Sequence, residues 1–133
     1  MKSEKVFSRN DCARILDLFD NYQANNETEK ELLDILKQQI SKSRQMDDEK
    51  INENFVTMDS RIVLKNIGNG SRDIYHLVLP DDSDIKNKKI SILSGIGTQI
   101  LGSRIGTVIK EKPGSEKYFI IEDIIQIQKS PDS

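Results

Sequence analysis

The spacing of apolar residues changes near residue 55, and this change constrains the fold more than any other feature of the chain. Before that point apolar residues recur every three or four positions, which is the spacing of an amphipathic helix. After it they alternate with polar residues, which is the spacing of a strand with one buried face. The sequence therefore predicts an α+β protein whose helices precede its sheet.

Two helices are predicted in the first half. Ser8 is a candidate N-cap for the first, with Asp11 in an acidic first turn. Thr28 and Glu31 fit a capping box at the start of the second. A short link between them favours an antiparallel helical hairpin, a short coiled coil, over residues 1–46. The apolar stripes that would pack together comprise Cys12, Ile15, Leu16, Phe19 and Tyr22 in one helix and Leu32, Leu33, Leu36 and Ile40 in the other.

The second half predicts an antiparallel sheet with one short helix, in a domain over residues 55–128. Asn69-Gly70 is a strong hairpin signal, and Pro113-Gly114 indicates a second turn. The polar segment 47–54 is expected to be a linker and 129–133 a loose tail. The expected strands cover 56–65, 73–80, 89–93, 106–112 and 117–128.

Four of the chain's seven glycines, at positions 95, 97, 102 and 106, lie in one apolar run over 91–109. A dinucleotide cradle needs G-x-G-x-x-G inside a βαβ unit, and a Walker loop needs G-K-[ST]. The spacing here matches neither pattern. We interpret the run as a short helix on the sheet, with Gly102 left-handed at its end and Gly106 at a bend.

Composition narrows the functional classes. The net charge of −2 gives no global basic field for nucleic acid, although a local basic patch remains possible. No apolar run is long enough to span a bilayer, and the N-terminus lacks the apolar core of a secretory signal. Cys12 is the only cysteine, which excludes an internal disulfide. We expect a soluble, cytoplasmic protein without membrane association.

No cofactor or metal site is predicted. His76 is the only histidine, and it lies in an expected strand far in sequence from Cys12. The carboxylates Asp47, Asp48 and Glu49 lack the spacing of a calcium loop, and we interpret them as part of a solvated linker.

Three collinear blocks carry a family resemblance: VTMDSRIVLKN at 56–66, YHLVLPDDSD at 75–84 and ISILSGIGTQILGSRIGTVI at 90–109. They resemble the C-terminal domain of the GreA/GreB transcript-cleavage factors, which implies an FKBP-like fold. Gly95 stands where that family usually has proline, Thr107 where it has aspartate, and Asp59 where asparagine is common. The short hairpin and its opening DCARILDLF are similar to the Rnk subgroup, the regulators of nucleoside diphosphate kinase.

The resemblance implies binding to bacterial RNA polymerase at the rim of its secondary channel, as a monomer or weak dimer that meets nucleic acid only through the polymerase. In the family, acidic residues at the hairpin tip help hold catalytic magnesium. Here helices of roughly 22–27 Å are too short to reach a buried centre, so we expect a non-enzymatic regulator without strong cleavage stimulation. The expected docking residues are Asp81, Asp82, Asp84, Ser94, Gly95, Ile96 and Gly97, and the hairpin tip offers Asp20, Glu27 and Glu29.

Three other functions are left open at this point. The chain could be a cleavage-stimulating elongation factor, or a protein-interaction module whose partner is not the polymerase. FKBP-like architecture alone suggests a prolyl isomerase. That activity needs a deep pocket lined by aromatic residues, whereas the chain has no Trp, four Phe and three Tyr.

Overall fold

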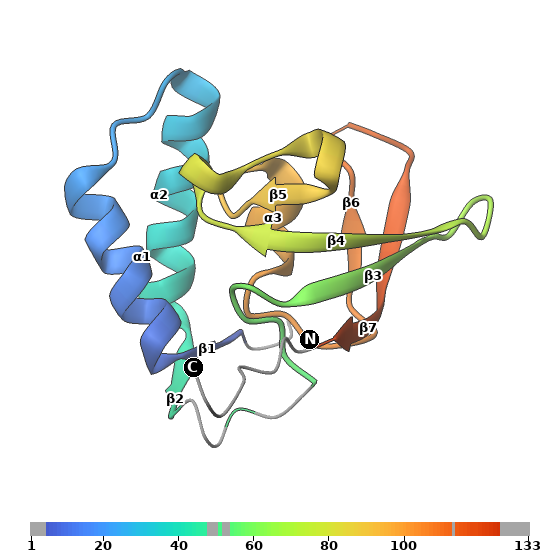
Figure 1. Ribbon diagram of the computed structural model, residues 1–133, viewed down its shortest axis with the longest axis horizontal. Coiled ribbons are helices and arrows are strands. Elements are labelled where there is room, and N and C mark those ends of the chain that lie inside the picture. The colour runs from blue at the N-terminus through green and yellow to red at the C-terminus, as the bar shows by residue number, and fades with distance from the viewer. Residues whose placement is uncertain (1–4, 48–50, 52–53, 113, 126–133) are drawn as a thin grey trace.

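The computed structural model describes residues 5–47, 51, 54–112 and 114–125. Two helices lie beside a curled five-stranded sheet, and a short third helix lies within the curve of the sheet (Figure 1). This mixed arrangement agrees with the prediction that helices precede the sheet. In chain order the elements are β1 (Val6–Ser8), α1 (Arg9–Asn21), α2 (Glu27–Lys42), β2 (Arg44–Met46), β3 (Arg61–Asn66), β4 (Arg72–Val78), the 3-10 helices η1 (Pro80–Asp82) and η2 (Ile85–Asn87), β5 (Lys89–Ser91), α3 (Gly95–Ile100), β6 (Val108–Lys110) and β7 (Tyr118–Ile125).

The strand order of the sheet is β5-β4-β3-β7-β6. The pairs β3–β4 and β6–β7 are antiparallel, as the hairpin signals predict, and the long-range pair β3–β7 is also antiparallel. The pair β4–β5 is parallel, which corrects the prediction of a fully antiparallel sheet. After β4 the chain passes through η1 and η2 and then enters β5 in the direction of β4, because this connection is a crossover and not a tight turn.

The predicted N-cap is correct for the first helix and wrong for the second. Ser8 caps α1, since its Oγ accepts from the backbone N of Asp11 at 3.0 Å. The box at Thr28 and Glu31 is wrong: α2 is capped by Asn26, whose Oδ1 accepts from Glu29 N at 2.9 Å. Asn26 carries a side-chain oxygen that can cap a helix two residues earlier than Thr28, so α2 begins at Glu27.

The strand predicted over 56–65 begins only at Arg61. Asp59 has a φ of 67°, and this left-handed residue interrupts the extended chain. The alternating pattern still identifies the buried side chains correctly on both sides of the interruption. Those buried residues are Val56, Met58, Ser60, Ile62 and Leu64.

A short parallel pair, β1 with β2, lies at the base of α1 and α2 and was not predicted. Three residues are too few to show a period, so no local pattern indicates either strand. Val6 N of β1 also donates to Gly102 O at 3.0 Å, which joins the first half of the chain to the second.

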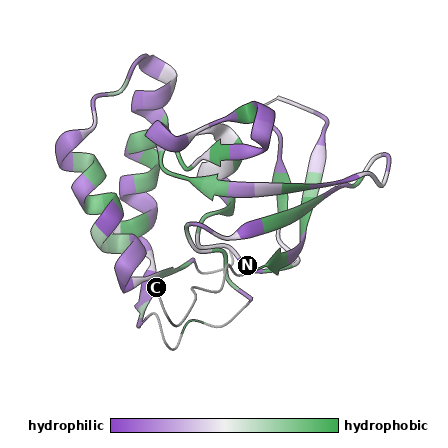
Figure 2. Cartoon of the chain, in the orientation of Figure 1, coloured by the Kyte–Doolittle hydropathy of each residue, from purple (hydrophilic) through white to green (hydrophobic). Residues whose placement is uncertain are grey.

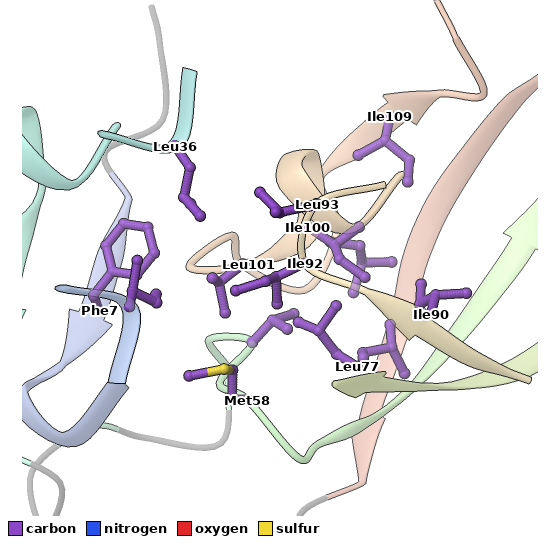
Figure 3. Close-up of a cluster of buried hydrophobic side chains, with 14 of the residues drawn as sticks. Phe7, Leu36, Met58, Leu77, Ile90, Ile92, Leu93, Ile100, Leu101 and Ile109 are labelled. Carbon is purple, nitrogen blue, oxygen red and sulfur yellow. The ribbon is translucent and has the colours of Figure 1, made fainter. Parts of the chain in front are cut away.

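One hydrophobic core extends through both halves of the chain. Phe7 of β1 and Leu36 of α2 lie beside Leu93 and Leu101 of the second half (Figure 3). Phe7 is 1% exposed. The predicted helical segment 1–46 and the predicted domain 55–128 therefore share one core. The predicted linker is described only at residues 47, 51 and 54, and the predicted tail lies outside the described residues.

A partly buried lysine also joins the two halves. Lys5 Nζ donates to the carbonyl oxygens of Thr98 at 3.0 Å, Gln99 at 2.8 Å and Leu101 at 2.9 Å. These carbonyls lie at the end of α3, where a helix leaves acceptors without partners of its own. Burial lowers the pKa of the Lys5 ammonium to about 8.

This shift predicts that stability rises with pH. Lys5 titrates at about 8 in the folded protein and at 10.5 in the unfolded chain, so between these values the unfolded chain binds more protons. The Lys5 contribution to the free energy of unfolding should increase across that window by up to about 3 kcal/mol. Urea denaturation across the window measures it, with Lys5→Met as the control. Parallel pH profiles for the two proteins would contradict the assignment.

Candidate functional site

The glycine-rich turn, residues 94–97, is held by hydrogen bonds centred on Ser94. Its Oγ donates to Ser91 O at 2.7 Å and accepts from Gly97 N at 2.9 Å, which caps α3. Gly97 is buried, and a Cβ at this position would lie 2.0 Å from Ser91 O. Only glycine lets α3 approach β5 this closely. Gly102 has a φ of 79°, as predicted for the residue after the helix.

The expected docking residues of the turn differ in exposure. Ser94, Gly95 and Ile96 are partly exposed, whereas Gly97 lies beneath them. A Cβ on Gly95 would meet only Glu111 O, at 3.7 Å. The backbone at Gly95 therefore tolerates a side chain, and the turn presents an open surface.

The acidic loop after β4, residues 80–84, faces α1. Asp81 and Asp82 of η1 are exposed, and with Tyr22 and the second half of α1 they line a hollow of about 350 Å³. Asp84 is half-buried, and its Oδ2 accepts from Asn87 Nδ2 at 2.6 Å. Asp81 and Asp82 thus share a surface with α1, an arrangement that the sequence did not predict, whereas the Asp84 carboxylate stabilises η2.

The expected tip residues lie where the 22–26 loop joins α1 to α2, and Figure 2 colours the first turn of α2 as hydrophilic. Asp20 and Glu27 are exposed. Glu29 instead accepts from Tyr22 Oη at 2.8 and 3.0 Å, and from Asn25 N at 2.8 Å. Burial, followed by the hydrogen bond and charge of Glu29 and the charge of Asp81, raises the pKa of Tyr22 to about 12. The Glu29 carboxylate thus orders the loop.

Two contacts that fix α1 against the second half had no local signal. Asp11 is buried, and its Oδ2 accepts from Met58 N at 2.9 Å. Arg14 Nη1 lies 2.7 Å from Asp59 Oδ2. Sequence reasoning assigned Asp11 only to the first turn of a helix, because its partner lies 47 positions away.

Among the described residues, no three His, Cys, Asp or Glu side chains gather in a way that could hold a metal ion. Cys12 is buried in α1 and His76 lies in β4. Within the same residues, every helix is too short or too polar to cross a bilayer.

Comparison with known proteins gives matches along most of the chain. A family described as "Transcription elongation factor, GreA/GreB, C-term" matches residues 51–126. The transcription elongation factor GreA of Amoebophilus asiaticus is 34% identical over 116 residues, covering 81% of this chain and 73% of that protein. The regulator of nucleoside diphosphate kinase of Escherichia coli is 24% identical over 103 residues, covering 77% and 74%.

A solved structure matches the fold. The transcription elongation factor GreA/GreB from Nitrosomonas europaea is 26% identical, with a TM-score of 0.77 over 94% of this chain and 100% of that chain. The chain spans 52% and 56% of two other GreA relatives that it matches, and about 72% of a third.

Proposed function

Because this chain belongs to the GreA/GreB family of transcription elongation factors, we propose that it regulates transcription by binding bacterial RNA polymerase at the secondary channel. One observation carries the proposal: the family match over 51–126 includes the whole acidic loop and the whole glycine-rich turn. The matches to a regulator of nucleoside diphosphate kinase and to a GreA/GreB structure support the same assignment.

The proposed docking surface combines two segments of an FKBP-like domain. The exposed part of the turn, Ser94 to Ile96, offers little side-chain obstruction to a partner's backbone. Asp81 and Asp82 add negative charge that would attract a basic partner surface. Gly97 and Asp84 support this surface from below through their packing and hydrogen bonds.

The helical pair forms a short arm in this proposal. α1 has 13 residues and α2 has 16, which correspond to about 20 and 24 Å at 1.5 Å per residue. Of the three acidic tip residues, Glu29 is already engaged by Tyr22 and Asn25. We therefore propose a non-enzymatic regulator that occupies the channel entrance without strongly stimulating cleavage, and that competes there with longer-armed factors.

The proposal is tested by incubating the full chain with purified core polymerase, with and without an excess of a long-armed Gre factor. We expect retention on the polymerase and its loss on competition. Stalled elongation complexes provide the second readout, where the RNA should stay largely intact. Absence of retention at micromolar concentration would overturn polymerase binding, and robust RNA shortening would overturn the short-arm argument alone.

Charge reversal tests the docking surface. The double variant Asp81→Lys and Asp82→Lys should bind core polymerase at least about tenfold more weakly, since lost charge pairs at an interface cost 1.4 kcal/mol or more. The matched control is Glu116→Lys with Asp123→Lys, which reverses the same charge on exposed positions outside both the docking surface and the helical arm. If both double variants weaken polymerase binding equally, binding depends only on net charge and the docking surface is wrong.

A further inference from the structure

Three basic side chains lie in a row across the solvent face of the sheet. Arg61 of β3 pairs directly with His76 of β4, and His76 pairs directly with Lys89 of β5. Directly paired residues have Cβ atoms about 5 Å apart on one face of a sheet. Arg61 is exposed while its neighbour Ile62 is buried, so the row lies on the face opposite the core.

The row borders a hollow of about 360 Å³ near the start of β5. Lys88 and Asn87 also line it, together with Tyr75 and Ile74 of β4. None of the described residues that line this hollow is acidic. The hollow is therefore a local basic patch on a chain whose net charge is −2.

The positive charge is only partly balanced. Lys88 Nζ lies 3.4 Å from Asp73 Oδ1, and both side chains are half-exposed. In the described part of the chain, neither Arg61 nor Lys89 makes an ion pair. Arg61 and Lys89 lie on either side of His76, and an anion bound between them would balance both charges.

His76 adds an unsatisfied polar atom. Its Nε2 is buried and has no hydrogen-bond partner in the structure. Such an atom in a native protein calls for an explanation. Because it is closed to solvent in this structure, a ligand oxygen in the hollow would bond it once the imidazole turns toward the hollow.

We propose that the Arg61–His76–Lys89 hollow binds a phosphate group. Guanidinium presents paired donors to a phosphate, and ammonium groups contribute point charges. The phosphate would come from a small free ligand or from a nucleic-acid strand, since both carry the same oxyanion. The site is independent of the polymerase-docking residues and goes beyond the proposed function.

The single histidine of the chain makes a direct test possible. Pyrophosphate is titrated into the full chain at constant ionic strength, and the imidazole proton resonances of His76 are followed by NMR. We expect a saturable shift. The double variant Arg61→Gln and Lys89→Gln should bind roughly tenfold more weakly or worse, because hydrogen bonds to charged groups contribute about 1.5–3 kcal/mol. The control, Lys42→Gln with Lys112→Gln, removes the same charge elsewhere and should titrate like the wild type.

Two results would overturn the site: a shift that saturates with neither pyrophosphate nor RNA, or equal titrations for the site variant and its control. Amide spectra establish that each variant is folded, and Lys88→Gln gives a second reading at a half-exposed position. A short single-stranded RNA forms the second arm. Saturation by both ligands supports a site for the phosphate group itself, and saturation by RNA alone assigns the phosphate to a nucleic-acid strand.

Discussion

Replacement of Gly97 by alanine is expected to lower the free energy of unfolding by about 3 kcal/mol or more, a large part of the roughly 5–15 kcal/mol of a typical domain. The added Cβ would lie 2.0 Å from Ser91 O, 2.9 Å from Ser91 C and 2.8 Å from Ser94 Oγ. Two of these atoms are backbone atoms of Ser91, the last residue of β5, and cannot rotate away. The clash can be relieved only by separating α3 from β5, which breaks the turn and the core beneath it.

Gly95→Ala is the matched control, because it makes the same change in the same short helix. The nearest atom to a Cβ at Gly95 is Glu111 O at 3.7 Å, an ordinary contact distance. We expect a change within about 1 kcal/mol, on the stabilising side. Urea denaturation of both variants decides the point. If Gly97→Ala proves as stable as Gly95→Ala, the close approach of α3 to β5 is wrong.

Replacement of Phe7 by alanine is expected to cost about 3–5 kcal/mol, the range for a fully buried phenylalanine. The ring is 1% exposed and lies against Gly102, where a Cβ would come within 3.1 Å of it. Because Phe7 belongs to the core shared by the helices and the sheet, both parts should lose stability together. Amide NMR signals from α2 and from β3 should therefore disappear at the same, lower urea concentration.

The control for this variant is Leu16→Ala, a leucine of α1 that is 53% exposed. Its loss should cost less than about 1 kcal/mol, since little apolar surface leaves the interior. A Phe7→Ala protein in which the sheet signals keep their wild-type midpoint while the helix signals are lost would show that the two halves fold independently.

The sequence predicted the β3–β4 hairpin correctly but gave no register for it. A two-residue turn at Asn69-Gly70 would place Gly68 opposite Ser71. Instead Asn66 N bonds to Ser71 O, and Gly70 is left-handed within a four-residue loop. The shift moves every partner by two positions, which preserves the buried face but changes the neighbours across the strands. The pairing of Arg61 with His76 therefore could not be predicted from the turn.

The contacts that unite the two halves had no signal in the sequence at all. Lys5 and Phe7 belong to a segment too short to show a period, and the three carbonyls that Lys5 bonds lie 93, 94 and 96 positions away. Helix caps were predictable to within two residues because their chemistry is local. Long-range polar contacts such as Asp11 with Met58 depend on the packed structure.

At two positions where this chain departs from the family pattern, the structure suits the residue that the family commonly has. Gly95 is the first residue of α3, a position where proline is favoured because its missing N–H would be unpaired in any case. Asp59 has a positive φ, a conformation that asparagine and aspartate adopt more readily than other side chains. Both positions thus favour the residues that the family commonly has there.

The shared core sets how the helical pair can be aimed. A swing of α1 and α2 away from the sheet would expose Phe7 and Leu36 to water, at about 1.5–3 kcal/mol for each side chain, and would strip Lys5 from its three carbonyls. These contacts thus hold the helical pair and the sheet in one relative orientation. When the sheet binds a larger assembly, its orientation there therefore also fixes the direction in which α1 and α2 point.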